Sequence, residues 1–93
     1  MKETNAEKID YRVEFKKVAD HWGYHMPMML AEECGELIQA VSKDQREFSL
    51  ETQEAVLTEM ADVIISIGAL MAQMELEPTD LFDRIDAKLM KKY

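Results

Sequence analysis

The residues with the clearest capacity for chemistry are four acids, arranged as two pairs with a spacing of three. Glu33 and Glu36 lie within the apolar run 30–37, and Glu59 and Asp62 lie within the next long apolar segment. Residues three apart on a helix share a side, so each pair would present its carboxylates together. Carboxylate oxygens are ligands that Mg²⁺ and Mn²⁺ prefer. Two such pairs facing one another predict a divalent-cation site with these four acids as its ligands.

The second pair carries most of this prediction. Glu59 and Asp62 belong to a narrow polar strip on a helix that is otherwise apolar nearly all round. Burying acids in such a helix is costly unless they are paired or coordinate a metal. A divalent ion held there would neutralise the acids and admit a polyphosphate, whose phosphorus an activated water could attack in line. Glu32 and Glu33 are the candidate bases for that water.

Two other interpretations compete with a phosphate-cleaving site. A Glu-x-x-Glu pair is common on solvated helix faces, so the acids could form a structural cation site in a catalytically idle helical oligomerisation module. A di-iron bundle would require Glu-x-x-His motifs, and neither His21 nor His25 stands at that spacing. An all-oxygen ligand set also favours Mg²⁺ or Mn²⁺ over iron or zinc.

The elements that must position these acids are helices. Helical periodicity predicts four of them, over about residues 5–21, 27–43, 50–74 and 78–92. Thr4 and Glu7 have capping-box spacing, Gly23 suits a C-cap and Ser49 suits an N-cap. Only 3 Gly and 2 Pro interrupt the chain, and no segment alternates as a strand does. We therefore expect a single all-α domain over residues 1–93, an antiparallel four-helix bundle.

The apolar stripes predict which faces pack. On the second helix, Glu33 lies at the edge of the stripe and Glu32 faces solvent. The third helix is apolar on nearly all sides, and a chain this small buries only a modest core. We therefore expect self-association, to a dimer or a tetramer, to complete the bundle. The expected stripes are Tyr11, Phe15, Val18 and Trp22 on the first helix and Leu30, Cys34, Leu37, Ile38 and Val41 on the second.

Charge and composition restrict the partners. A net charge of −8 argues against nucleic acid or an anionic membrane surface. The longest apolar run, residues 63–72, is shorter than the roughly 20 residues of a membrane span. Cys34 is the only cysteine, so it has no internal disulfide partner and fits a reducing compartment. With no signal-peptide pattern at the N-terminus, these features predict a soluble cytoplasmic protein.

Other residues are weaker candidates for contacts with a substrate. His25 follows Tyr24 in a predicted connector, where a histidine is usually solvated or capping. Trp22 packs in the core or at an interface, or stacks on a base. Lys88 and Lys91 suit the C-terminal end of the last helix, where cations are favoured by the dipole, and phosphate contact is their functional alternative.

The double motif resembles a known family. The signature of the MazG-like all-α nucleotide pyrophosphatases is similar to the pattern found here, which is Glu33-x-x-Glu36, a spacer of 22 residues and Glu59-x-x-Asp62. The residues that flank both motifs also resemble that family. The resemblance implies Mg²⁺-dependent hydrolysis of a (d)NTP between the α and β phosphates, giving a (d)NMP and pyrophosphate. It implies the four acids as metal ligands and Glu32 as a base or water-orienting group.

The resemblance extends to a branch of that family. Residues 24–27, Tyr-His-Met-Pro, are similar to the aromatic-His-x-Pro lead-in of single-domain dCTP pyrophosphatases, which implies that His25 lies by a base pocket. That branch tends to follow the proline with Arg-Asn, where this chain has Met28 and Met29. Near the C-terminus Lys88 stands where the family often has an asparagine. Phosphoribosyl-ATP pyrophosphohydrolases share the superfamily, so phosphoribosyl-ATP remains an alternative substrate.

Overall fold

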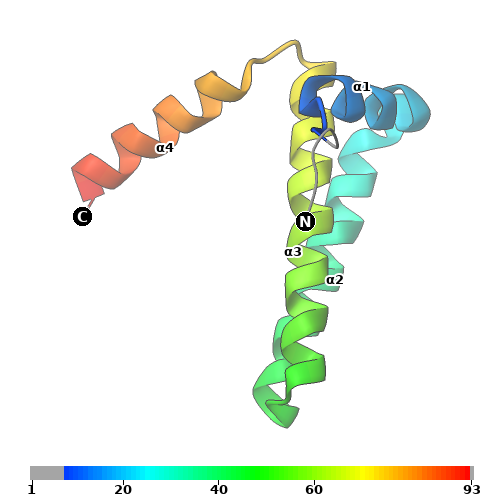
Figure 1. Ribbon diagram of the computed structural model, residues 1–93, viewed down its shortest axis with the longest axis vertical. Coiled ribbons are helices and arrows are strands. Elements are labelled where there is room, and N and C mark those ends of the chain that lie inside the picture. Colours follow the sequence, from blue (N-terminus) through cyan, green and yellow to red (C-terminus); the bar gives the residue numbers. More distant parts are fainter. Residues whose placement is uncertain (1–7, 93) are drawn as a thin grey trace.

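Helices account for nearly all of the chain that this computed structural model describes, residues 8–92. In order they are α1 (Tyr11–Trp22), the 3₁₀-helix η2 (Gly23–His25), α2 (Met26–Glu47), α3 (Leu50–Gln73) and α4 (Pro78–Lys92). No strand occurs among the described residues, so the expected all-α class is confirmed. Figure 1 shows that α2 and α3 run side by side, α1 lies across one end of them, and α4 extends away from all three.

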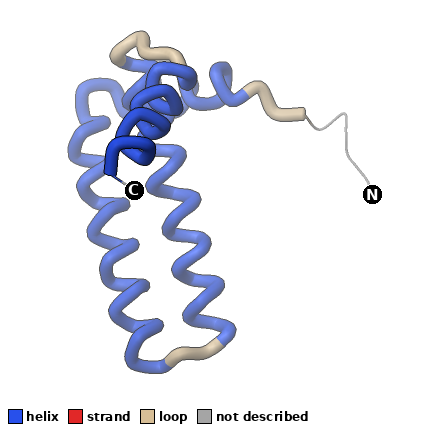
Figure 2. Tube along the Cα trace, turned by 90° about the vertical axis from the view of Figure 1, so that its left-hand side faces the viewer, coloured by secondary structure: helices blue, strands red, loops and turns tan. Residues whose placement is uncertain are grey.

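The two long helices α2 and α3 form an antiparallel hairpin (Figure 2). Phe48 ends α2 in the left-handed conformation, with φ of 48°. Ser49 then caps α3, accepting from the Thr52 N–H, and Thr52 returns the contact in a capping box. The Thr52 hydroxyl, which is buried, also donates to Asp44 Oδ1 at 2.6 Å. The sequence at the tip thus ties the end of α2 to the start of α3.

At the other end of the hairpin, α1 packs across α3. Gly68 permits this approach, since a Cβ built there would overlap the ring of Phe15. The Gln73 side chain donates to the Gly23 carbonyl and so links the end of α3 to the turn after α1. The small buried core lies at this crossing and consists of Ala19, Met26 and Ala69.

The last helix leaves the hairpin through a tight turn. Glu75 adopts the left-handed conformation, with φ of 60°, and the Leu76 N–H donates to the Met71 carbonyl at 2.9 Å. This pattern is a Schellman motif, which ends a helix and redirects the chain. Because α4 then runs away from α1, α2 and α3, one chain by itself is not a four-helix bundle.

Two predicted helix boundaries were wrong. The first helix was expected from about residue 5 but begins at Tyr11, because the Asp10 side chain caps it by accepting from the Arg12 and Val13 N–H groups. The proposed capping box of Thr4 and Glu7 lies outside the described residues. The second helix was expected to end at about residue 43 but continues to Glu47, since nothing in residues 43–47 breaks a helix. The boundaries of α3 and α4 agree with the prediction to within a residue.

The predicted core stripe of α2 was wrong for Ile38 and Val41, while Leu30, Cys34 and Leu37 are partly buried. Ile38 is 66% exposed and Val41 is exposed as well, whereas Met26 and Glu33 are the buried residues of this helix. The helix is therefore rotated so that Glu33 faces α3 and the apolar stripe is only partly covered. On α3, too, apolar side chains are left bare, including Leu57 and Ile64. Among the described helices α3 alone is long and apolar enough to cross a membrane, a test that core helices of soluble proteins also pass.

Candidate metal centre

Three of the predicted acids converge between α2 and α3. One carboxylate oxygen from each of Glu33, Glu59 and Asp62 lies within 4.8 Å of the other two. Glu33 comes from the middle of α2, while Glu59 and Asp62 lie one turn apart on α3. Oxygens bound to one Mg²⁺ at about 2.0–2.1 Å in an octahedron are roughly 2.9–4.2 Å apart. The three side chains therefore need only small adjustments to share one ion.

The carboxylates at this site lack the partners that buried acids normally have. Glu33 is 9% exposed. Its Oε1 and the Oε1 of Glu59 are buried atoms with no hydrogen-bond partner among the described residues. Buried polar atoms without partners are rare in folded proteins and mark places where an ion or water belongs. Two unsatisfied carboxylate oxygens among three clustered acids fit a hard divalent cation.

The electrostatics of the site agree with its geometry. Burial raises the pKa of Glu33, and repulsion from Glu36, Asp62 and Glu59 raises it further. Burial also raises the pKa of Glu59, with repulsion from Glu36 and Asp62 adding to it. The neighbouring acids thus destabilise the ionised forms of Glu33 and Glu59. A bound cation would reverse that effect, because opposite charge favours the ionised form.

The other two predicted acids lie at the periphery. Glu36 is exposed, yet it is close enough to raise the pKa of both Glu33 and Glu59. Glu32 is exposed, as the sequence predicted, and it is not part of the three-acid cluster. Glu36 therefore stands at the edge of the cluster, and Glu32 stands outside it.

The predicted substrate-contacting residues are not gathered at the cluster. His25 is exposed in η2, where its ring lies 4.8 Å from that of Tyr24 between centroids. Trp22 ends α1 and is 36% exposed, with its ring edge-on to that of His21. Lys88 and Lys91 are exposed on α4, which extends away from the hairpin that carries the acids. Within one chain the two lysines and the acid cluster are not brought together.

Sequence reasoning missed one residue that shapes the fold at the end of the hairpin beyond the site. Gly68 lets α1 cross α3 two turns beyond Asp62, and α1 covers that end of the hairpin. A glycine in the middle of a strongly helical pattern was the available signal, since it is unfavourable there without a packing reason.

A comparison with protein families decides what kind of domain carries this cluster. The model of the MazG nucleotide pyrophosphohydrolase domain matches residues 25–93. The chain belongs to the MazG family. The match includes α2, α3 and α4, and with them all four acids of the double motif, so the resemblance seen in the sequence is confirmed. Searches of curated proteins and of solved structures found no match.

Membership of the MazG family implies nucleotide pyrophosphohydrolase activity. The acid cluster of this MazG domain is suited to the divalent metal that the family generally uses. The matched region begins at His25, so α1 and Trp22 lie outside it.

Proposed function

We propose that this MazG domain is an Mg²⁺-dependent pyrophosphohydrolase that cleaves a (d)NTP between its α and β phosphates. The observation that carries the proposal is the convergence of Glu33, Glu59 and Asp62, two of them with unsatisfied buried oxygens. These three acids hold the cation, and Glu36 joins them from the edge of the cluster. Mn²⁺ would serve the same oxygen ligands.

A divalent cation held by these acids would neutralise charge on the triphosphate and polarise its phosphoryl oxygens. The acids of the chain bind the cation and accept the proton of the attacking water. Glu33 accepts a proton from the attacking water at Oε1, the oxygen that has no partner in the folded chain. The new bond joins the water oxygen to the α-phosphorus, and the bond from that phosphorus to the bridging oxygen breaks, releasing pyrophosphate.

Glu32 is the alternative base that the sequence left open. Its exposed position outside the cluster supports a smaller role, as a group that orients water from the solvent side. Substrate contacts from His25, Trp22, Lys88 and Lys91 also remain part of the proposal. The proposal also includes self-association, which is expected from the apolar third helix. It includes a cytoplasmic location, which is expected from the lone Cys34.

The deciding experiment is a substrate panel. The protein is incubated with each (d)NTP and with phosphoribosyl-ATP in the presence of Mg²⁺, and pyrophosphate release is measured. We expect pyrophosphate and a nucleoside monophosphate from at least one substrate. Release of orthophosphate alone would refute cleavage between the α and β phosphates. No release from any substrate would favour a catalytically idle module.

Variants separate the roles of the acids. Asp62→Asn and Glu59→Gln should lose both Mg²⁺ affinity, measured by calorimetry, and activity. Glu54→Gln is the matched control, because it makes the same charge change at an exposed position of α3 and should alter neither. If Glu32→Gln abolishes turnover while Mg²⁺ affinity is kept, the proton acceptor is Glu32 and not Glu33.

A further inference from the structure

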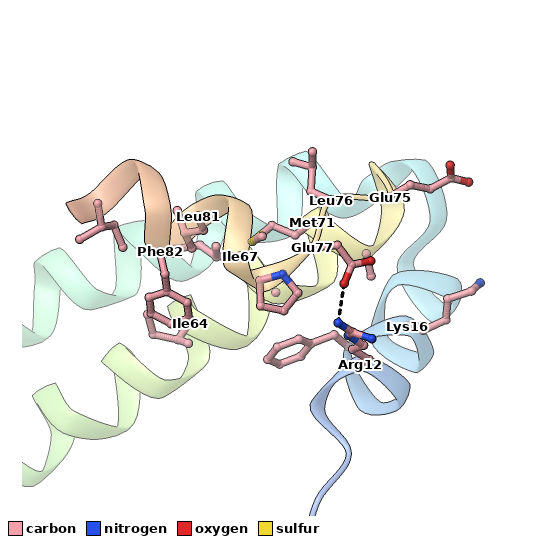
Figure 3. A pocket seen from close by; sticks show the side chains of 15 residues that line it. Arg12, Lys16, Ile64, Ile67, Met71, Glu75, Leu76, Glu77, Leu81 and Phe82 are labelled. Atoms are coloured by element: carbon pink, nitrogen blue, oxygen red, sulfur yellow. Dashed lines mark ion pairs between the residues drawn. The ribbon is translucent and has the colours of Figure 1, made fainter. Parts of the chain in front are cut away.

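The first helix is tied to the end of α3 by one side-chain contact near each of its ends. Near its start, Arg12 forms an ion pair with Glu77, which lies just beyond α3 (Figure 3). At its finish, the side-chain amide of Gln73 donates to the carbonyl of Gly23, 50 residues away in the sequence. The ion pair borders an apolar groove between α3 and α4, whose α3 side includes Ile64, Ile67 and Met71. The contact made by Gln73 is different, because it reaches the turn that leads into α2.

The Gly23 carbonyl lies at a sharp turn of the backbone. Gly23 has φ of 56° and ψ of −137°, a conformation that glycine adopts far more readily than other residues. Its N–H ends α1 by donating to the Ala19 carbonyl, and its own carbonyl accepts from the N–H of Met26, the first residue of α2. The Gln73 amide donates to that same carbonyl. Gln73 therefore holds the residue at which α1 gives way to η2 and α2.

Few other contacts orient the side chains of this turn. None of the three residues of η2 is buried, and Tyr24 is 88% exposed. His25 stands at the N-cap of α2, yet its side chain makes no capping hydrogen bond to the described start of that helix. A single 3₁₀ turn also has poorer hydrogen-bond geometry than an α-helix. The direction of the Tyr24 and His25 rings is thus set by the backbone of η2, and through Gly23 by Gln73.

The strip of α3 that carries the acids also carries Gln73. Asp62 and Gln73 are eleven residues apart on α3, so they lie within about 20° of each other around the axis and about 16 Å apart along it. From Glu33 back to His25 the chain covers eight residues, or about 12 Å of helical rise. An extended nucleotide covers a comparable distance from its phosphates to its base. A triphosphate held at the acid cluster can therefore direct its nucleoside toward η2.

We propose that Gln73 is a positioning residue for the nucleoside part of the substrate. By donating to the Gly23 carbonyl, it fixes η2 so that the rings of Tyr24 and His25 meet the nucleoside while the acids hold the cation. Gln73 itself is remote from the acids and acts only through Gly23. This inference rests on the proposed function, and it adds a residue whose effect is confined to the nucleoside end of the site.

The alternative is that the contact only ties α1 to the hairpin. Loosening α1 at its other end should then have the same effect, and the pair of Arg12 with Glu77 supplies that comparison. This pair is largely exposed and lies at the end of α1 opposite η2. Glu77→Gln therefore loosens α1 without touching the turn. Gln73→Met removes the donor at the turn and keeps the length of the side chain.

The test compares two uncleavable probes by calorimetry in Mg²⁺. The first is the tightest-binding α,β-methylene analogue among the common (d)NTPs, and the second is methylenediphosphonate, which has the same phosphorus–carbon link but no nucleoside. Gln73→Met should weaken binding of the nucleotide analogue by about three- to tenfold, the value of one hydrogen bond, and leave the affinities for methylenediphosphonate and Mg²⁺ unchanged. Gln73→Lys keeps a donor of similar reach and should restore most of the lost affinity. Glu77→Gln, and Gln53→Met at an exposed position of α3, should alter neither probe.

The single tryptophan gives a readout that needs no ligand. Trp22 directly precedes Gly23 and is 36% exposed. If Gln73 fixes the turn, acrylamide should quench Trp22 fluorescence more strongly in Gln73→Met than in wild type. Glu77→Gln should match wild type in the same measurement. Gln73→Glu also removes the donor and keeps the shape of the side chain, so it replaces Gln73→Met if that variant does not fold.

The proposal is overturned if loss of the Gln73 donor leaves binding of the nucleotide analogue unchanged, or if it weakens binding of methylenediphosphonate or Mg²⁺ to the same extent. It is also overturned if Glu77→Gln weakens nucleotide binding equally, or if wild type binds no analogue. A lower Tm with unchanged affinity would reduce the contact to a tie between α1 and the hairpin. Analogue binding without pyrophosphate release from any substrate would refute the proposed activity alone, so the two proposals fail distinguishably.

Discussion

Replacing Glu33 with glutamine should make the metal-free protein more stable, although the glutamate is buried in the fold. Glu33 Oε1 has no hydrogen-bond partner, and two other carboxylates lie within 4.8 Å of its oxygen. Glutamine keeps the shape of the side chain, removes the charge and brings an amide that can donate to the neighbouring acids. Leaving a buried acceptor unsatisfied costs about 1–3 kcal/mol. We take the low end, about 1 kcal/mol, because water and salt screen a cluster whose edge is open at Glu36.

Thermal unfolding in EDTA, at equal protein concentrations, measures this effect. A gain of about 1 kcal/mol corresponds to a rise in Tm of roughly 4–8 °C for a domain of this size. Mg²⁺ should then reverse the order of stability, so that wild type becomes more stable than Glu33→Gln. At a concentration of 100 times its Kd, an ion that binds only the folded state adds about 2.7 kcal/mol. Wild type should gain that stability, and Glu33→Gln should gain much less.

The control is Glu54→Gln, which removes a charge from an exposed position on the same hairpin. Its Tm should match wild type in EDTA and rise equally with Mg²⁺. The reasoning is refuted if Glu33→Gln is no more stable than this control in EDTA, or if Mg²⁺ stabilises all three proteins alike. Either result would mean that the clustered acids carry no strain that a cation relieves.

Three further predictions concern the same fold. The pKa of Glu33 is raised above its usual 4.5 in the folded state, so at this group the folded protein binds more protons than the unfolded chain. The free energy of unfolding in EDTA should therefore fall as pH rises above 4.5. Urea unfolding across pH measures this fall, which should be smaller in Mg²⁺. Gly68→Ala should cost about 1–3 kcal/mol by forcing a methyl group into the Phe15 ring. By contrast Gly35→Ala, in open space on α2, should gain up to about 1 kcal/mol; equal urea midpoints for the two would contradict the proposed α1–α3 packing. Thr52→Val removes the hydroxyl that accepts from the Ser49 N–H and donates to Asp44 Oδ1, while the backbone N–H that Ser49 caps is kept. It should lower the free energy of unfolding by about 1–2 kcal/mol, and an unchanged midpoint would mean that the tip of the hairpin is not held by this side chain.

Local signals in the sequence predicted the later helices well. Ser49 marked the start of α3, and Pro78 marked the start of α4. Both positions depend on chemistry within a few residues, which a sequence displays directly. The start of α1 was missed because Asp10 is also a good N-cap, and a cap further upstream looked equally suitable. Which of two possible N-caps starts the helix depends on packing against residues that are distant in the sequence.

Of the four acids predicted as metal ligands, the structure clusters Glu33, Glu59 and Asp62 and leaves Glu36 at the edge, and the burial of Glu33 was not predicted. The spacing of Glu33, Glu59 and Asp62 was enough to expect that they face one another, and the structure brings the three together. A helical wheel, however, placed Glu33 at the edge of an apolar stripe that included Ile38. The structure buries Glu33 and exposes Ile38, because the rotation of a helix is set by the whole surface it packs against. An acid that points inward is unfavourable by itself, so a rule based on hydrophobicity will place it outside.

The position of α4 could not be deduced from its own sequence. Its apolar stripe showed that one side must be covered but did not show by what. The direction of the helix depends on Glu75 in a left-handed conformation and on an ion pair between Arg12 and Glu77, which are far apart in the chain. Contacts of that kind carry no periodic signal.

Because α3 presents acids on one side and a groove on the other, changes in its length should be more harmful than changes in its composition. A single inserted residue after Asp62 would turn everything beyond it by about 100° and advance it by about 1.5 Å. Ile64 and Met71 would then leave the groove, and Gly68 would leave Phe15, even though no side chain had been altered. Conservative substitutions disturb only one side at a time. Over evolutionary time this helix should therefore accumulate exchanges among apolar residues while insertions and deletions are confined to the turns at its two ends.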